Sequence, residues 1–354
     1  MPQSACGIIR SMVGGAMKIV RTLTLLVMFG VPVACGPFQD TRPSEVDLRP
    51  PQLQSVSTIG PTEVRVEFDE DAALVADKTR ISPALAVTDI TAPGRQVVIR
   101  AETQTPGRLY TLEAEAEDAK GNRASFVADF YGYNGRVPRL LINEFITRGS
   151  GNHPDLVELK ALTAGDMGGA VLYQGTPSSF DTRIVFPAFA VGEGAFILVH
   201  WKPSGDPGEV DETDDMAASK GFDVSDSAWD LWVAGGTGLS GNNGVLSLYD
   251  RPGGKCLDGV LYSNRTSQSD ELYRGFGSAG TLMRAEELVK DGGWKSAGAR
   301  VMPEDAVNPE GSTGTRSICR PSGSADTDTS VDWHIVPTRK ASFGAENSDE
   351  VYAP

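Results

Sequence analysis

The sequence has few of the residues that mark catalytic or metal sites. Its three histidines, His153, His200 and His334, do not share the spacing of a zinc motif. The chain contains no G-x-S-x-G elbow, no H-E-x-x-H pair and no phosphate-binding loop. A zinc centre or a Ser-His-Asp triad would need residues that only the folded chain brings together. We therefore expect a protein that is not an enzyme and has no cofactor.

Basic residues are also scarce. The chain has 32 Lys and Arg against 47 Asp and Glu, a net charge of −15. Residues 1–34 hold no acidic residue, so a chain that has lost them is more acidic still. Such a surface repels phosphate backbones, and no basic patch offsets it in the sequence. We expect no nucleic-acid partner.

The N-terminal region contains an apolar stretch, residues 23–31, that is too short to span a bilayer. Lys18 and Arg21 precede it, and the small residue Ala34 stands just before Cys35. This order of charge, apolar core and small residue is typical of a bacterial secretory signal. We interpret residues 17–34 as a signal peptide and residues 1–16 as an extension ahead of the true start.

The end of this signal resembles a lipobox, the motif in which a cysteine is acylated and becomes the new amino terminus. The resemblance implies a covalent lipid on Cys35 and a membrane partner held through that lipid. Gly36 follows where an Asp would retain some lipoproteins in the inner membrane, which implies the outer membrane. Residues 35–52, rich in proline and polar side chains, are predicted to be a lipidated flexible tether.

Cysteine is rare beyond the export region, where only Cys256 and Cys319 remain. In an exported protein, such a pair predicts a disulfide, which would close a long loop. Two separately buried thiols are the alternative, because sequence alone does not bring two Cα atoms together.

Residues 53–135 show the two-residue period of half-buried strands. Val64, Val66 and Phe68 alternate with charged residues, and a similar run begins at Tyr110. A D-x-x-G-N turn at residues 118–122 then follows. These strands and this turn resemble the bacterial Ig-like modules of surface proteins, which implies a small antiparallel β-sandwich.

A second set of strands begins at Arg139 and places Glu144 and Glu158 at corresponding positions of two short runs. Two carboxylates would suit the acid and base of a glycosidase. Nothing near them forms a recognisable catalytic constellation, so we expect a structural role instead.

Residues 139–347 resemble the lamin-tail domain, an immunoglobulin-like sandwich also found in exported bacterial proteins. The resemblance rests on motifs in a shared order: Ile142-Asn143-Glu144-Phe145, Leu156-Val157-Glu158-Leu159, residues 166–172, Phe186-Pro187 with residues 191–199, residues 237–250, Gly259-Val260-Leu261-Tyr262, and the closing segments 315–320 and 326–333. Residues 348–354 follow as a tail.

Two insertions interrupt this pattern. Residues 204–230 are strongly acidic and predict a disordered surface loop. Asp211, Asp214 and Asp215 within it are the candidate Ca²⁺ ligands, although the spacing of a calcium loop is absent. Residues 281–293 place apolar side chains on one face and end at Gly292, which predicts a helix packed on the sheet.

All five tryptophans lie beyond residue 200, and Trp201 and Trp229 flank the acidic insertion. If these two are exposed, they would stack on sugars or anchor a protein partner. Trp232 and Trp333 have strand-like surroundings and are predicted to be buried.

Together, these patterns predict an all-β chain of two tandem antiparallel β-sandwiches with a disordered acidic insertion and one short helix in the second. The expected function is that of a cell-envelope lipoprotein which displays these domains for adhesion, scaffolding or protein–protein interaction. Its partner would be an envelope or host protein, or a glycan. The alternative is a carbohydrate-binding or hydrolytic envelope protein.

Overall fold

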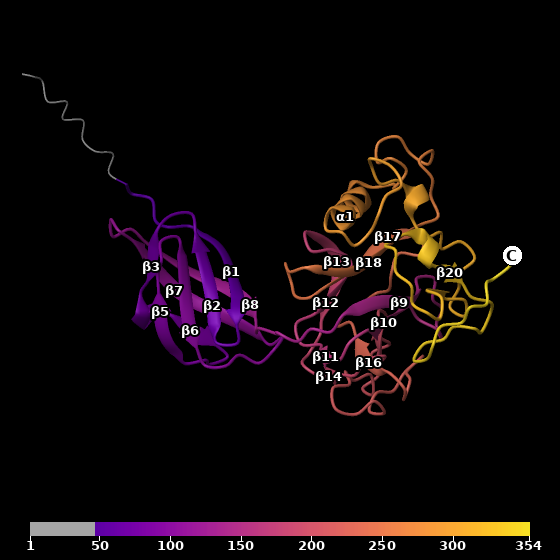
Figure 1. The fold of residues 1–354 in the computed structure, drawn as a ribbon, viewed down its shortest axis with the longest axis horizontal. Helices are drawn as coiled ribbons and strands as arrows, with labels where there is room; N and C mark the ends of the chain where they lie inside the picture. The colour runs from indigo at the N-terminus through magenta and orange to yellow at the C-terminus, as the bar shows by residue number, and fades with distance from the viewer. Residues whose placement is uncertain (1–46) are drawn as a thin grey trace, which may run out of the picture. The chain divides into compact units, whose positions relative to one another are not determined.

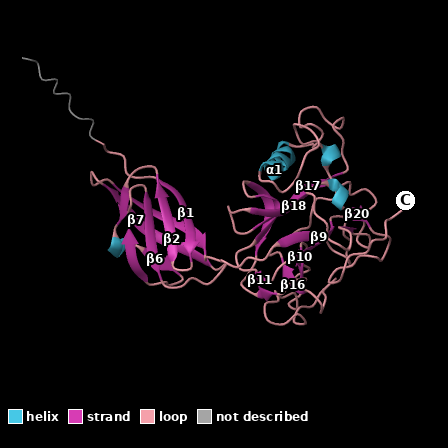
Figure 2. Ribbon diagram, viewed as in Figure 1, coloured by secondary structure: helices cyan, strands magenta, loops and turns pink. Residues whose placement is uncertain are grey.

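The computed structural model describes residues 47–354. Cys35, the signal expected over residues 17–34 and the extension 1–16 lie outside the described residues, as does most of the tether. Within the described part, strands dominate and α1 (Ala279–Lys290) is the one α-helix (Figure 2). The all-β prediction is confirmed. That helix and the short 3₁₀ segments of the described chain are too short or too polar to cross a bilayer.

The first set of strands, residues 53–131, forms two sheets around its own core (Figure 1). The first sheet has the order β1 (Leu53–Gly60), β2 (Glu63–Phe68), β6 (Gln96–Ala101), β5 (Val87–Thr91). The second is built on β7 (Leu109–Asp118), which pairs with β3 (Ala72–Leu74), β4 (Arg80–Ser82) and β8 (Arg123–Tyr131). A 3₁₀ turn, η1 (Ala76–Lys78), joins β3 to β4.

Alternating side chains of these strands build the first core. Val64 and Val66 are fully buried, while the charged residues that alternate with them, Glu63, Arg65 and Glu67, are partly exposed. The turn after β7 closes as the sequence predicts. The Asp118 carboxylate accepts the Asn122 amide at 2.9 Å, and Gly121 adopts a φ of +84°.

The second set of strands forms a six-stranded and a four-stranded sheet around a larger core. The six-stranded order is β16 (Trp229–Trp232), β15 (Phe196–His200), β10 (Leu156–Ala161), β9 (Leu140–Ile146), β19 (Ile318–Cys319), β20 (His334–Ile335). The four-stranded order is β13 (Ser179–Val185), β12 (Val171–Thr176), β17 (Asn243–Tyr249), β18 (Cys256–Ser263). A small pair, β11 (Gly165–Asp166) with β14 (Ala190–Val191), and two 3₁₀ turns, η2 (Pro303–Asp305) and η3 (Ser330–Asp332), complete it.

The pairing in this set is antiparallel except between β15 and β16, which run parallel. This exception follows from the acidic insertion, which carries the chain from the end of β15 back to the start of β16. Antiparallel neighbours need only a tight turn, whereas a parallel neighbour needs a long crossover. The insertion is therefore a connection that the sheet requires.

β9 is buried at all seven positions, including the polar residues Asn143 and Glu144. A strand on the surface of a sandwich usually leaves one face exposed, and β9 does not. The outer face is covered because the C-terminal segment, residues 337–347, bonds to it through Ser342 and Asn347. A strand with both faces covered must satisfy its polar side chains inside the protein.

α1 confirms the predicted helix. Ser278 caps its N-terminus by accepting the Thr281 amide at 3.1 Å, and Gly292 with a φ of +82° follows its end. Ala285 and Leu288 are fully buried against the core. The helix packs on β12 and β17 of the four-stranded sheet.

Arg320 is a fully buried cation at the centre of the second core. Its guanidinium donates to both carboxylate oxygens of Asp258 at 3.2 Å and to Asp326 at 3.1 Å. Asp332 lies 3.5 Å away, and the Trp333 ring lies 4.6 Å from the guanidinium carbon. Arg320 and Asp258 have no solvent-exposed side-chain surface, so water cannot stabilise their charges. Each therefore needs the opposite charge of the other.

The predicted disulfide between Cys256 and Cys319 is wrong, since both thiols are free. Cys256 lies on β18 of the four-stranded sheet and packs beside Tyr249. Cys319 lies on β19 of the six-stranded sheet, with its sulfur 3.6 Å from His334 Nε2. Counting cysteines could not reveal that the two residues belong to different sheets.

We expect Arg320→Ala to lower the free energy of unfolding by about 3–5 kcal/mol, because it leaves buried carboxylates without a cation. Urea denaturation followed by tryptophan fluorescence measures this change. Arg251→Ala is the matched control, since Arg251 pairs with Asp250 on the surface with 55% of its side chain exposed. Equal midpoints for the two variants would contradict the structural role of Arg320.

We expect both thiols to be alkylated in the denatured, unreduced protein. Burial raises the pKa of the Cys256 thiol to about 12, and it also raises the pKa of the Cys319 thiol. The folded protein should therefore react slowly with an alkylating reagent near neutral pH. Peptide mass spectrometry after alkylation without reductant is the measurement. A linked peptide pair that separates only on reduction would contradict the free thiols.

Candidate functional site

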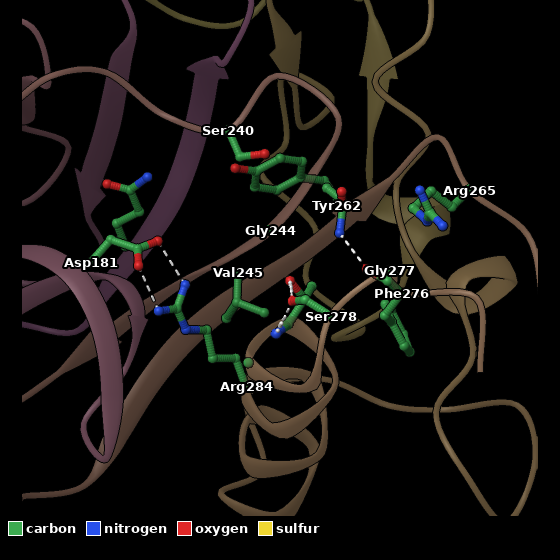
Figure 3. Close-up of a pocket in the computed structure, with 14 residues that line it drawn as sticks. Asp181, Ser240, Gly244, Val245, Tyr262, Arg265, Phe276, Gly277, Ser278 and Arg284 are labelled. Carbon is green, nitrogen blue, oxygen red and sulfur yellow. Dashed lines mark hydrogen bonds and ion pairs between the residues drawn. The ribbon is translucent and has the colours of Figure 1, made fainter. Parts of the chain in front are cut away.

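A cavity of about 380 Å³ lies at the N-terminal end of α1 (Figure 3). We call it the α1 pocket. β17 and β18 supply its floor, β12 and β13 one wall, and the loop before α1 the other. The lining residues that matter below are Asp181, Asn243, Tyr262, Arg265, Ser278 and Arg284.

Tyr262 places an unpartnered hydroxyl at this pocket. β18 holds the side chain with no exposed surface, and its ring packs against Phe145 in the core. The hydroxyl oxygen has no hydrogen-bond partner among the described residues. Burial raises the pKa of Tyr262, so the group stays a neutral O–H that can donate. A buried polar group left unpaired costs about 1–3 kcal/mol.

Two arginines flank the pocket in fixed positions. Arg284 of α1 donates to both oxygens of Asp181 at 2.7 Å, and Figure 3 shows this paired contact. Arg265 donates to the Gly275 carbonyl and approaches Asp270 at 3.4 Å. A planar guanidinium held by two bonds keeps one geometry, so both cations are preorganised.

The loop before α1 brings the helix start to the pocket. Gly275 and Gly277 adopt φ values of +94° and +78°, and a side chain at Gly277 would meet the Arg265 guanidinium at 2.9 Å. Asn243 donates to the Phe276 carbonyl at 2.9 Å and fixes the loop on β17. Glycine is required at these positions by the turn and by the arginine packed against it.

The α1 pocket offers several groups that can bond to a ligand. It offers an O–H donor, two fixed cations and a helix N-terminus, and no histidine lines it. Its hydroxyl groups belong to Ser240, Tyr262, Ser278 and Thr281, and the carboxylate in the lining, Asp181, is paired with Arg284. Small polar ligands occupy cavities of this size, since ligand pockets begin at about 300 Å³.

The tryptophans expected to form a ligand platform are not a surface pair. Trp201 is fully buried and donates its indole N–H to Gln174 at 3.0 Å, so it offers no face to a ligand. Trp229 is half-buried and packs against Phe189 at a centroid distance of 5.3 Å. Trp232 and Trp333 are buried as predicted.

The acidic insertion is not a disordered loop. Glu212 is 1% exposed and accepts the amides of Ser219 at 2.9 Å and Asp230 at 2.8 Å. Asp230 in turn bonds to the buried His200 at 2.6 Å. The composition argument missed this because a buried carboxylate is tolerated once backbone amides satisfy it.

The candidate calcium ligands do not converge. Asp211 accepts the Trp232 amide at 2.8 Å, and Asp215 accepts the Ala217 amide at 3.0 Å, while Asp214 is exposed. Within the described chain, these three belong to no group of acidic side chains close enough to share an ion. A Ca²⁺ site at Asp211, Asp214 and Asp215 is therefore not supported, because calcium needs six or more converging oxygens.

Glu144 and Glu158 stand directly opposite each other on β9 and β10. Both are fully buried, and each carboxyl group accepts hydrogen bonds from other residues of the protein. Glu144 accepts from Ser317 and from the Ser342 amide at 3.0 Å, and Glu158 accepts from the Gly344 amide at 2.6 Å. Burial raises the pKa of both, and that of Glu158 most strongly because Glu144 adds like-charge repulsion.

The remaining histidines also make local bonds. His153 lies 2.9 Å from Asp223 at a cavity of about 470 Å³, and His334 lies 2.8 Å from the Ser348 carbonyl. The three histidines therefore occupy three separate places, as their spacing in the sequence suggests.

Sequence reasoning missed most of the α1 pocket. The sequence pattern identifies Tyr262 only as a strand residue. The predicted helix begins at Thr281, so the prediction does not include the cap at Ser278. A serine after glycines and three residues before a helical run is a capping signal that could have extended the helix. Nothing in the sequence marks the Tyr262 hydroxyl as unpaired.

Comparison with known proteins gives a family match and one curated relative. A family model described as "protein second domain" (TP_1001_2nd) matches residues 138–335. An uncharacterized protein of Treponema pallidum (strain Nichols) is 25% identical over 158 residues, which are 45% of this chain and 40% of the relative. The match thus spans less than half the length of that relative.

One solved structure also resembles part of the chain. It is the crystal structure of the N-terminal part of the bacterial S-layer protein SbsC, at 16% sequence identity and a TM-score of 0.24. The likeness covers 42% of this chain and 40% of that one.

We expect stability to fall as the pH rises above about 5, and to fall less in Glu158→Gln. A carboxyl group with a raised folded-state pKa favours folding while protonated, and this contribution is lost as the pH rises through that pKa. Urea midpoints at pH 5 and pH 8 measure the slope. Glu193→Gln, at an exposed carboxylate, is the control and should keep the wild-type slope. Identical slopes for all three proteins would refute the assignment.

Proposed function

The chain belongs to the family described as "protein second domain", which it matches over residues 138–335. From the sequence around Cys35 and the all-β architecture, we propose a role for the whole protein. It is a cell-envelope lipoprotein that displays two β-sandwich domains, the second of lamin-tail type. The domains act in adhesion, scaffolding or protein–protein interaction and carry out no chemistry.

The closure of the Glu144–Glu158 pair supports a non-catalytic role most directly. A glycosidase needs its two carboxylates on opposite sides of a substrate-filled gap. Here both are without exposed surface, and the C-terminal segment bonds to them through Ser342 and Gly344. A substrate would have to displace that segment before reaching either carboxylate.

The proposed anchor rests on the sequence around Cys35. The charged start, short apolar core and Ala34-Cys35 junction are those of an acylated export signal. One acyl chain binds a membrane only weakly, whereas the multiply acylated cysteine of such proteins would hold it stably. The outer membrane is the proposed location, on the strength of Gly36 after the cysteine.

Carbohydrate binding is the second candidate, and the α1 pocket favours it. The hydrolytic alternative is not favoured, because the carboxylate pair that it would use is buried. Trp201 is also buried, so it cannot form a surface for stacking sugars. The pocket instead offers hydroxyl and amide groups of Ser240, Asn243 and Tyr262 in a cavity of about 380 Å³. A small number of polar groups fixed in a concave site is typical of sites that bind small polar ligands.

We expect Cys35→Ser to move the full chain from the membrane fraction to the soluble fraction and to abolish incorporation of labelled palmitate. Fractionation and labelling of cells expressing either form are the measurements. Proteinase treatment of intact cells should degrade the wild-type domains if they face outward. Unlabelled wild-type protein, or a serine variant that fractionates unchanged, would overturn the anchor.

A further inference from the structure

We propose that the α1 pocket binds the anionic group of a small hydroxylated ligand, a sugar acid or sugar phosphate, at the first turn of α1. A second ligand oxygen bonds to the Tyr262 hydroxyl. This assignment narrows the carbohydrate-binding candidate to a ligand class and rests on that candidate. It does not depend on lipid at Cys35.

The first turn of α1 presents backbone amides at the positive end of the helix dipole. Ser278 caps the Thr281 amide, but the amides of Ala279 and Gly280 have no acceptor within the described chain. The first turn carries no acidic side chain. The aligned peptide dipoles of a 12-residue helix place roughly half a positive charge there, which attracts anions.

Space for a ligand exists in front of this turn. A Cβ atom added at Gly280 would have only the Ser278 hydroxyl within 4 Å, at 3.9 Å. The absence of a side chain at Gly280 lets a bound group approach the helix amides closely. Because the cavity and the helix start are continuous along Ser278 and Thr281, one ligand can reach both.

Tyr262 supplies the independent sign of a ligand. Its hydroxyl is buried, unpartnered and at the pocket wall, where Figure 3 shows it between Ser240 and Gly244. A Cβ atom at Gly244 would lie 2.5 Å from that hydroxyl, so glycine keeps its approach clear. Buried polar atoms are almost always bonded, and an orphan facing a cavity is satisfied when a ligand oxygen occupies it.

The charge of the lining points to an anion. Arg265 and Arg284 oppose the single carboxylate of Asp181 among the lining residues, in a chain whose net charge is −15. Asp270 partly balances Arg265 from outside the lining, at 3.4 Å. Each guanidinium has five N–H donors, more than its bonds to its aspartate and to neighbouring oxygens use, and the remaining donors can bond to a small anion.

The size and remaining groups suggest a hydroxylated scaffold. The cavity of about 380 Å³ exceeds what a bare carboxylate or phosphate fills and matches a monosaccharide. Ser240 and Asn243 also line the cavity, and Figure 3 shows Ser240 away from the helix end at Ser278. Such groups bond to sugar hydroxyls as donors and acceptors.

Calorimetric titration of the full chain tests the proposal with four probes: glucuronate, glucose 6-phosphate, glucose and inorganic phosphate. We expect at least one of the two sugar anions to bind about tenfold more tightly than glucose or inorganic phosphate, because both the charge and the hydroxyls contribute. Which sugar anion binds distinguishes a carboxylate from a phosphate ligand. The same titration of Cys35→Ser should be unchanged.

Two substitutions locate the binding in the pocket. Gly280→Asp puts a carboxylate in the first turn and should weaken anion binding about tenfold, while Gly280→Asn, of equal size, keeps most of it. Tyr262→Phe removes only the unpartnered hydroxyl, so affinity should fall several-fold without a lower melting temperature.

Several results would overturn the proposal. Failure of both sugar anions to bind at millimolar concentration would do so, as would inorganic phosphate binding as tightly as they do. Equal affinity for glucose would overturn the anion site and leave the carbohydrate-binding candidate standing. Unchanged affinity in Gly280→Asp would place any binding elsewhere. None of these results bears on the lipid anchor, which the Cys35 experiment tests separately.

Discussion

Burial of charge on the outer face of the six-stranded sheet is the constraint on which the second domain depends. Glu144 and Glu158 face each other there with no exposed surface, and Arg320 lies among aspartates in the same core. Ionisable groups in such surroundings are tolerated only when each one, charged or protonated, is paired or hydrogen-bonded. Ser317 and Asn143 donate to the glutamates from the sheet side. The C-terminal segment supplies the remaining donors at Ser342 and Gly344, so the buried carboxyl groups hold that segment in place.

The buried carboxyl groups have a structural role, and the groups that could bind a ligand lie elsewhere in the domain. The carboxylates that resemble a catalytic pair in the sequence form hydrogen bonds that stabilise the fold, and so does the His200–Asp230 pair. The α1 pocket has the opposite character, because its Tyr262 hydroxyl and the first amides of α1 have no partner within the described chain. The unpartnered Tyr262 belongs to the lining of a cavity, whereas the bonded glutamates lie under the C-terminal segment. A binding role is consistent with both observations.

Local patterns predicted the strands and the helix well, because periodicity and turn residues act over a few neighbours. Val64, Val66 and the turn at Asp118 lie where the two-residue period and the turn chemistry indicate. The failures all involve contacts between distant segments. The pairing of Cys256 with Cys319, the exposure of Trp201 and the disorder of the acidic insertion depend on sheet membership and covering segments, which local sequence does not encode. The α1 pocket went unnoticed for the same reason.

Native-state amide hydrogen exchange tests the central claim most directly. If the C-terminal segment is bound by the buried glutamates, the amides of Ser342 and Gly344 should exchange only on global unfolding, with the same free energy as Leu159 in β10. Exchange of these two amides through a separate, low-energy opening, while Leu159 stays protected, would contradict the account.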